Sequence, residues 1–179
     1  MDRYLEELQN TIAEAISGMT TEQLEFHLDG KWSAAEVLEH LYLTYRGTAK
    51  ACEHCLQEGK ILARRPVLQD RIRASVVIGL GYMPEGREAP ERSRPRGMAT
   101  QEVVKAIGQE IAVMEAALTR CEELFGARAR VLDHPVLGPL TARQWRKFHL
   151  VHGRHHVKQI WALRNENAAP VISSERTPA

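Results

Sequence analysis

The sequence has no long apolar run and no excess of charge of one sign. No segment approaches the roughly 20 consecutive apolar residues that a helix needs to cross a bilayer, which argues against a membrane-spanning protein. The 24 basic and 23 acidic residues leave a formal net charge of +1. This balance does not favour binding to nucleic acid or to an anionic membrane, so we expect neither as a partner.

Cysteine is also scarce, and the three cysteines present are an odd number. A secreted disulfide framework needs paired cysteines, and the charged segment 1–7 does not resemble a signal peptide, so we expect a cytoplasmic protein. Cys52 and Cys55 form a Cys-x-x-Cys pair, with only Cys121 as a further partner. Because the pair falls late in an expected helix, we predict partly buried thiols rather than a zinc ribbon or a redox motif.

Strand-like alternation of apolar and polar residues is absent as well, and helical periodicity dominates the chain. Apolar residues spaced by three and four predict helices over about residues 3–16, 34–57, 67–80, 100–124 and 142–164. Ser33 with Glu36 and Thr141 with Gln144 form capping boxes before two of them, and Thr100 is the expected cap of a third. The pattern predicts an all-α fold, a four-helix bundle with one extra element and long connections.

Residues 1–165 are expected to form a single domain, because neither half of the chain looks able to bury a core of its own. The segment 84–97 contains three prolines and two glycines. It predicts a long loop, either mobile or folded over a site entrance, with a domain boundary as the competing interpretation. Arginines 92, 94 and 96 of this loop could contact an anionic thiol cofactor, but nearby glutamates balance them. Residues 166–179 are expected to be a flexible tail.

Histidine is the residue type that is concentrated, since four of the eight histidines lie within positions 149–156. His152 and His156 are four residues apart, so on a helix their imidazoles project from one face about one turn apart. This spacing allows two ring nitrogens to bind one metal ion. The alternative is a polar helix face that happens to be rich in histidine.

A metal ion needs a further ligand, and His40 is the best candidate on another long helix. Val37 and Leu41 place it at the edge of the apolar stripe of that helix. A buried imidazole there requires a polar partner, because an unpaired one is costly. That partner is either a metal ion shared with His152 and His156 or a backbone carbonyl.

Two segments resemble a known family. Residues 32–41, with the pattern Trp-Ser-x-x-Glu-Val-Leu-x-His-Leu, resemble the second-helix motif of the DinB-like metalloprotein superfamily. Residues 134–145, with the pattern His-Pro-x-x-Gly-x-x-Thr-x-x-x-Trp, and the following His152-x-x-His155-His156-x-x-Gln159 are similar to its closing helix. The resemblance implies a four-helix bundle, often dimeric, in which His40, His152 and His156 bind zinc or nickel and one coordination position stays open.

Other residues near the cluster have several possible roles. His155 points about 100° away from His156 around the helix and is expected at the site rim or in solvent. His149 is expected to be structural, with a second shell or an alternative metal ligand as the other possibilities. Gln159 is placed to orient a ligand histidine or a bound water. Glu36 is explained by its capping box, and a general base is the alternative.

Two classes of function are compatible with these residues. In the first, the protein is a metal-dependent enzyme that activates a low-molecular-weight thiol or water for transfer to, or hydrolysis of, a small-molecule substrate. Some relatives implied by the resemblance are thiol-dependent transferases or isomerases. In the second, the metal only stabilises the bundle, and the protein acts through partners or by metal sequestration. A homodimer is expected from the resemblance.

Overall fold

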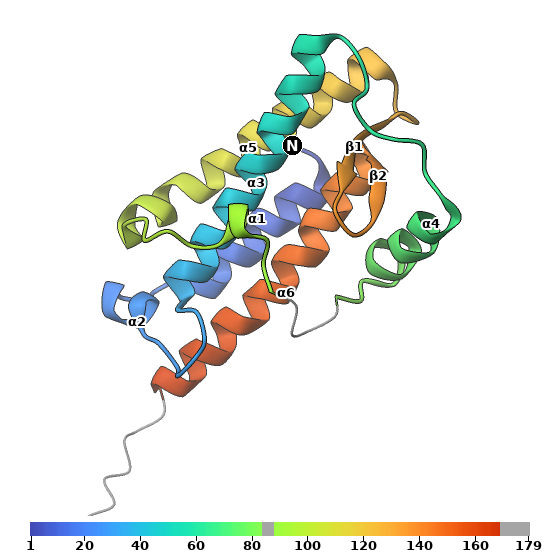
Figure 1. Cartoon of the computed structure of the whole chain (residues 1–179). Coiled ribbons are helices and arrows are strands. Elements are labelled where there is room, and N and C mark those ends of the chain that lie inside the picture. The colour runs from blue at the N-terminus through green and yellow to red at the C-terminus, as the bar shows by residue number, and fades with distance from the viewer. Residues whose placement is uncertain (84–87, 169–179) are drawn as a thin grey trace, which may run out of the picture.

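The computed structural model describes residues 1–83 and 88–168, and this part of the chain is mostly helical (Figure 1). The helices are α1 (Arg3–Ile16), α2 (Thr21–Glu25), α3 (Ala34–Glu58), α4 (Leu68–Ala74), α5 (Thr100–Phe125) and α6 (Ala142–Ala168), with a π-helical turn at Ser75–Gly79 and a 3₁₀ turn at Glu91–Ser93. Every predicted helix is present. Helix α6 continues to Ala168, into the segment expected as a tail, and the rest of that segment lies outside the described residues. None of the described helices is long and apolar enough to cross a membrane.

The expectation of no strands is wrong for one short hairpin. Strands β1 (Arg130–His134) and β2 (Gly138–Thr141) pair antiparallel. The register shifts between Arg130 and Leu132, so two consecutive residues of β1 are buried and the alternation that marks a strand in sequence is lost. The turn returns through Gly138, whose φ of 72° is in the left-handed region that favours glycine.

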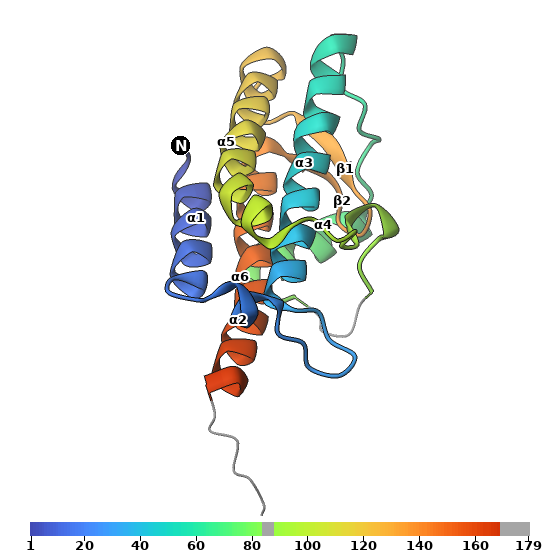
Figure 2. The ribbon, with the colours of Figure 1, turned by 90° about the vertical axis from the view of Figure 1, so that its left-hand side faces the viewer.

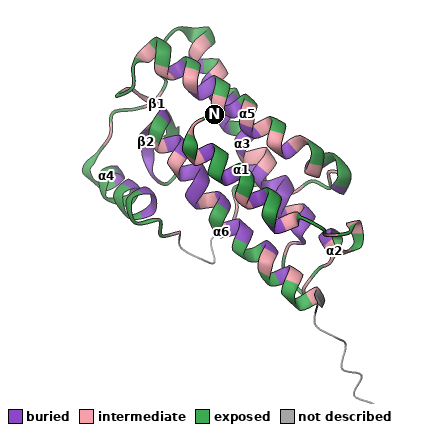
Figure 3. Ribbon diagram, turned by 180° about the vertical axis from the view of Figure 1, so that it is seen from behind, coloured by how far each residue is buried: buried purple, intermediate pink, exposed green. Residues whose placement is uncertain are grey.

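The four long helices lie side by side, with α1 packed on α6 and α3 packed on α5 (Figures 1 and 2). Contacts of α6 with α3 and α5 join these two pairs. Buried residues line the facing sides of the helices, while exposed residues follow their outer sides (Figure 3). The core includes Leu5, Leu8, Leu38, Leu41, Met114, Leu118 and Ile160.

Both predicted capping boxes are confirmed. Ser33 N–H donates to Glu36 and Glu36 N–H donates to the Ser33 hydroxyl, and Thr141 and Gln144 exchange the same two bonds at the start of α6. The prediction for Thr100 is wrong, because Ala99 occupies the cap position of α5. The Thr100 hydroxyl instead donates to Glu25 at 2.5 Å and ties α2 to α5.

Gly153 allows α1 and α6 to approach closely. A Cβ atom added at this position would overlap the side chain of Leu8 and lie 3.4 Å from the Tyr45 hydroxyl. Leu8 and Tyr45 are both fully buried, so neither can move without disturbing the core. The residue that follows His152 is therefore fixed as glycine by helix packing.

We expect Gly153→Ala to lower the free energy of unfolding by about 1–3 kcal/mol, the usual cost of forcing a methyl group into a filled core. Urea unfolding followed by circular dichroism measures this loss. Gly47→Ala is the matched control, because Gly47 lies within α3 and has nothing within 4 Å of the added Cβ. The control should be neutral or more stable by up to about 1 kcal/mol. Equal effects of the two substitutions would contradict this account of Gly153.

Candidate metal centre

Helices α3 and α6 bring His40, His152 and His156 together. The Nε2 atom of His152 lies 3.3 Å from Nε2 of His40 and 3.1 Å from Nε2 of His156. One ligand atom from each of the three side chains falls within 4.8 Å of the others, so the group could hold a metal ion. His40 and His156 are 3% and 8% exposed, and His152 is partly exposed. Residues 112 positions apart in sequence thus form one cluster.

Hydrogen bonds on the far side of two rings fix where their protons lie. Nδ1 of His40 is 2.7 Å from the Ser93 carbonyl oxygen, which can only accept, so Nδ1 donates. Nδ1 of His156 donates in the same way to the Gln159 side-chain oxygen at 2.9 Å. In the neutral form of each ring, Nε2 therefore carries a lone pair that points into the cluster. The sequence predicted either a backbone carbonyl or a shared metal ion as the polar partner of His40. The carbonyl of Ser93 is that partner at Nδ1, while Nε2 faces the other two histidines.

Burial keeps these rings neutral. It lowers the pKa of His156 to about 3 and places the pKa of His152 well below its usual value, and neighbouring imidazoles add to both shifts. Burial also lowers the pKa of His40, although the bond to the Ser93 carbonyl opposes the shift. At neutral pH all three rings therefore have the uncharged form that binds metals.

The donor set fits a divalent metal ion. Two lone pairs, from His40 and His156, face the single Nε2 atom of His152, which has at most one proton to share between them. Nδ1 of His152 is buried and has no hydrogen-bond partner among the described residues. A cation between the three rings would satisfy all three Nε2 atoms. Bond lengths of 2.0–2.1 Å with tetrahedral angles place ligand nitrogens about 3.3 Å apart, close to the spacings found here.

His149 does not belong to this group. The Thr48 hydroxyl donates to the Thr44 carbonyl oxygen at 3.2 Å. Its oxygen therefore accepts the proton of His149 Nε2, which lies 3.1 Å away. His149 is fully buried, and its ring contacts Tyr45 and Trp145. This packing agrees with the structural role expected for His149.

Sequence reasoning assigned no contact with the three histidines to Phe148, Trp32 or Ser93, although Trp32 belongs to the first family segment. The Phe148 ring stacks on His152 with an interplanar angle of 13°, and Trp32 lies 5.2 Å from His40 between ring centroids. Ser93 is 53 positions from His40, and no local pattern could have paired them. Phe148 is four residues before His152, so helical spacing alone could have found it.

The remaining candidates lie as follows. Gln159 contacts His156, as expected for a residue that orients a ligand histidine. The carboxylate of Glu36 is engaged in its capping box. The ring of His155 lies 5.2 Å from that of His156 between centroids, and His155 is half-buried. Arg94 pairs with Glu88, which agrees with a balanced loop.

The three cysteines are free and fully buried, more deeply than expected. The Cys55 thiol donates to the Val131 carbonyl oxygen, and the Cys121 thiol donates to the Cys52 carbonyl oxygen. Burial raises the pKa of Cys52 and of Cys121. These thiols have the inert character of core residues.

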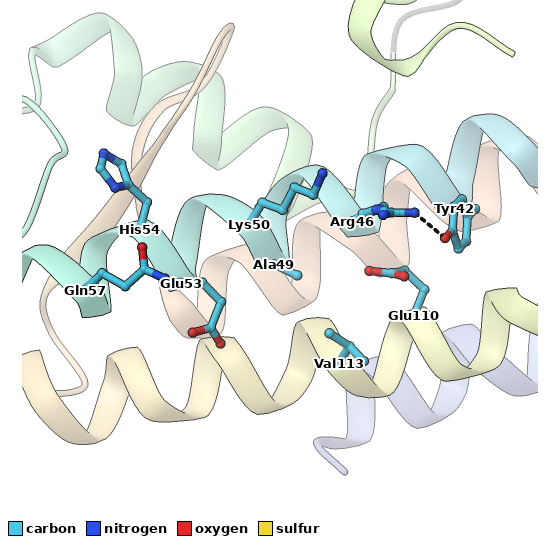
Figure 4. Close-up of a pocket in the computed structure, with 9 residues that line it drawn as sticks. All are labelled: Tyr42, Arg46, Ala49, Lys50, Glu53, His54, Gln57, Glu110 and Val113. Atoms are coloured by element: carbon cyan, nitrogen blue, oxygen red, sulfur yellow. Dashed lines mark hydrogen bonds between the residues drawn. The ribbon is translucent and has the colours of Figure 1, made fainter. Parts of the chain in front are cut away.

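A surface pocket lies between α3 and α5, away from the three histidines (Figure 4). Its lining includes Tyr42, Arg46, Lys50 and Glu110, and Arg46 donates to the Tyr42 hydroxyl. Charges of both signs line this pocket.

The mostly helical fold and the three converging, neutral histidines place the chain in the class of candidate helical metalloproteins. The sequence model of the DinB superfamily matches residues 4–160. The chain belongs to this superfamily, as the resemblance predicted. Neither the curated proteins nor the solved structures compared with the chain include a match to it.

His134, the first residue of the second family segment, holds the hairpin turn. Its Nδ1 atom accepts the backbone N–H groups of Val136 and Leu137, each at 3.1 Å. Its ring packs against Phe148, with centroids 4.4 Å apart. Burial lowers the pKa of His134 to about 4, with a smaller contribution from the charge of Arg92. Protonation of Nδ1 would remove the acceptor for both bonds.

We expect this histidine to make stability depend on pH. Its pKa is about 4 in the folded chain and about 6.5 when unfolded, so the unfolded state takes up the proton first. The stabilisation is complete above about pH 6.5 and is lost as the pH falls toward 4. His134→Asn keeps an acceptor but cannot titrate, so the wild type should lose stability relative to this variant over that range. Urea unfolding at pH 7.5, 6.0 and 4.5 tests this, and parallel curves would contradict it.

Proposed function

We propose that this protein binds one divalent metal ion, zinc or nickel, through His40, His152 and His156. The observation that carries the proposal is the convergence of three Nε2 atoms, two of which have their lone pairs directed inward by Ser93 and Gln159. Membership of the DinB superfamily supports the same ligand set. We infer that α1, α3, α5 and α6 form the four-helix bundle of that family, within a single domain of residues 1–165.

We propose further that the site is enzymatic and acts on a small-molecule substrate. A bound divalent ion would lower the pKa of a low-molecular-weight thiol or of water and stabilise the resulting anion. Support comes from His149, the alternative ligand that could have closed the site, because it lies outside the group of three histidines that could hold a metal and its Nε2 donates to Thr48. Three protein ligands leave a coordination position for an exogenous molecule, as in catalytic zinc sites.

The residues around the cluster have defined roles in this proposal. Ser93 and Gln159 hold the protons on Nδ1, so that Nε2 stays available. Phe148 and Trp32 provide apolar walls beside His152 and His40 and limit the access of water. No acid or base other than these imidazoles is assigned, so the reaction class remains transfer to, or hydrolysis of, a small electrophile.

We also propose that the protein is a homodimer and lies in the cytoplasm. Three free cysteines support a reducing compartment. The outer side of α4 and of the turn that follows it exposes Leu68, Ile72 and Leu80. An exposed apolar patch of this kind supports a protein contact, for which a second copy is the family's usual partner. The alternative function, a non-catalytic metal-binding bundle that acts through other proteins, would use the same three histidines.

We expect purified protein to contain about one zinc or nickel ion per chain, because three neutral imidazoles in this arrangement form a complete set of protein ligands. Elemental analysis by mass spectrometry measures this content after incubation with each metal salt. The His40/His152/His156 triple alanine variant should lose the metal. The matched control replaces the exposed His27 and His54 by alanine and should retain it. A wild type that contains no metal would contradict the proposal, and so would a control variant that loses as much metal as the triple variant.

We expect nickel-loaded protein to bind a thiol at the open position. Addition of glutathione should produce a sulfur-to-nickel charge-transfer absorption in the near ultraviolet, because a thiolate is a soft ligand for such a metal. S-Methylglutathione has no thiol and serves as the control. A spectrum that glutathione leaves unchanged, in protein shown to contain nickel, would overturn the thiol proposal and favour either water as the activated group or the non-catalytic alternative.

A further inference from the structure

Glu39, the residue before His40, is buried and holds the loop that crosses α3. Its side chain is only 4% exposed. One carboxylate oxygen accepts the backbone N–H of Arg96 at 2.8 Å, and the other accepts those of Gly97 and Met98 at 3.1 and 3.0 Å. A buried carboxylate would be costly without such donors. These three bonds give Glu39 a complete set of partners within the chain.

Backbone geometry favours this arrangement. Gly97 has a φ of 86°, in the left-handed region that favours glycine. A turn of this kind can direct successive N–H groups toward one anion. Both oxygens of Glu39 are used by the loop, and Glu39 is not part of the group that could hold a metal. A fourth metal ligand and a general base are therefore poor descriptions of this residue.

The same loop also contacts His40. Ser93, in the 3₁₀ turn Glu91–Ser93, provides the carbonyl oxygen that accepts the Nδ1 proton of His40. The segment 93–98 is thus attached to α3 at two consecutive residues, once through Glu39 and once through His40. Figure 1 shows the segment passing across α3 as a strap.

We propose that Glu39 is a positioning residue for the metal site, acting through the strap of residues 93–98. By holding three amides of the strap, Glu39 keeps the Ser93 carbonyl on Nδ1 of His40. The lone pair of Nε2 then points toward His152 and His156. This inference rests on the proposed metal site and adds a residue whose side chain touches neither the metal ligands' nitrogens nor the ion.

The coupling must work in both directions. If an ordered strap favours metal binding, metal binding must favour the ordered strap by the same factor, because the two equilibria share one thermodynamic cycle. Amides of Arg96, Gly97 and Met98 should therefore exchange with deuterium more slowly after zinc is added. Amides of Gly126 and Ala129 serve as the internal reference for global stabilisation, because they donate to backbone carbonyls at the end of α5 that lies away from the strap.

The test compares wild type with Glu39→Ala, Glu39→Gln and Glu36→Gln. Zinc affinity is measured by competition with a chromophoric chelator, and the ligand field by the visible spectrum of the cobalt-loaded protein. We expect Glu39→Ala to weaken zinc binding about 10–100-fold, the usual effect of losing outer support of a ligand, and to change the cobalt spectrum. Glu39→Gln should lose less, because its amide oxygen still accepts. Glu36→Gln, one turn earlier on α3, keeps a capping-box residue and should match wild type.

Each result decides the matter. A folded Glu39→Ala variant with wild-type zinc affinity and an unchanged cobalt spectrum overturns the role of Glu39 and leaves the metal site intact. A wild-type chain that binds neither zinc nor nickel overturns both proposals. If Glu39→Ala does not fold, hydrogen exchange of the wild type decides: selective slowing at residues 96–98 supports the coupling, and equal slowing at Gly126 and Ala129 overturns it.

Discussion

The candidate metal centre depends on a conflict between two inward-facing nitrogen lone pairs that share one possible donor, the Nε2 atom of His152. Outer hydrogen bonds direct the Nε2 lone pairs of His40 and His156 inward, where only His152 is available as a donor. Like dipoles that face one another in a poorly solvated interior repel, and a cation removes the repulsion. The folded chain is therefore expected to be less stable without an ion at this cluster than with one. Local rules for a satisfied core are often broken in this way at functional sites.

The helical part of the fold could be predicted because its determinants are local. The apolar spacing in α1, α3 and α5 reports burial directly, and the capping boxes at Ser33 and Thr141 mark helix starts within three residues. The hairpin could not be recognised, because the register shift in β1 removes the alternation that reveals strands. Thr100 shows the limit of such rules, since its hydroxyl bonds to Glu25, 75 positions away, rather than to its own helix.

The residues of the candidate site also differ in how far local sequence patterns could predict them. His152 and His156 follow from helical spacing, and His40 required its position on an apolar stripe together with a family resemblance. Of the residues that direct the lone pairs of these histidines, one was predicted from sequence and the others were not. Gln159 lies one turn from His156 and was expected, whereas Ser93 and Glu39 act across a loop whose path no periodic pattern specifies. Residue spacing along one helix cannot predict contacts that form where a loop crosses that helix.

The depth of the cysteines has a practical consequence. Cys52, Cys55 and Cys121 are fully buried, and burial raises the pKa of Cys52 and of Cys121. The protein that we propose to handle thiols thus keeps its own thiols out of contact with substrates and with the metal. The Cys121 thiol bonds to α3 and the Cys55 thiol bonds to β1, so alkylating reagents can reach these cysteines only when the packing of α3 against α5 or against the hairpin opens. Mass spectrometry of alkylated protein would therefore separate opening of α3 from α5, at Cys52 and Cys121, from opening at the hairpin, at Cys55.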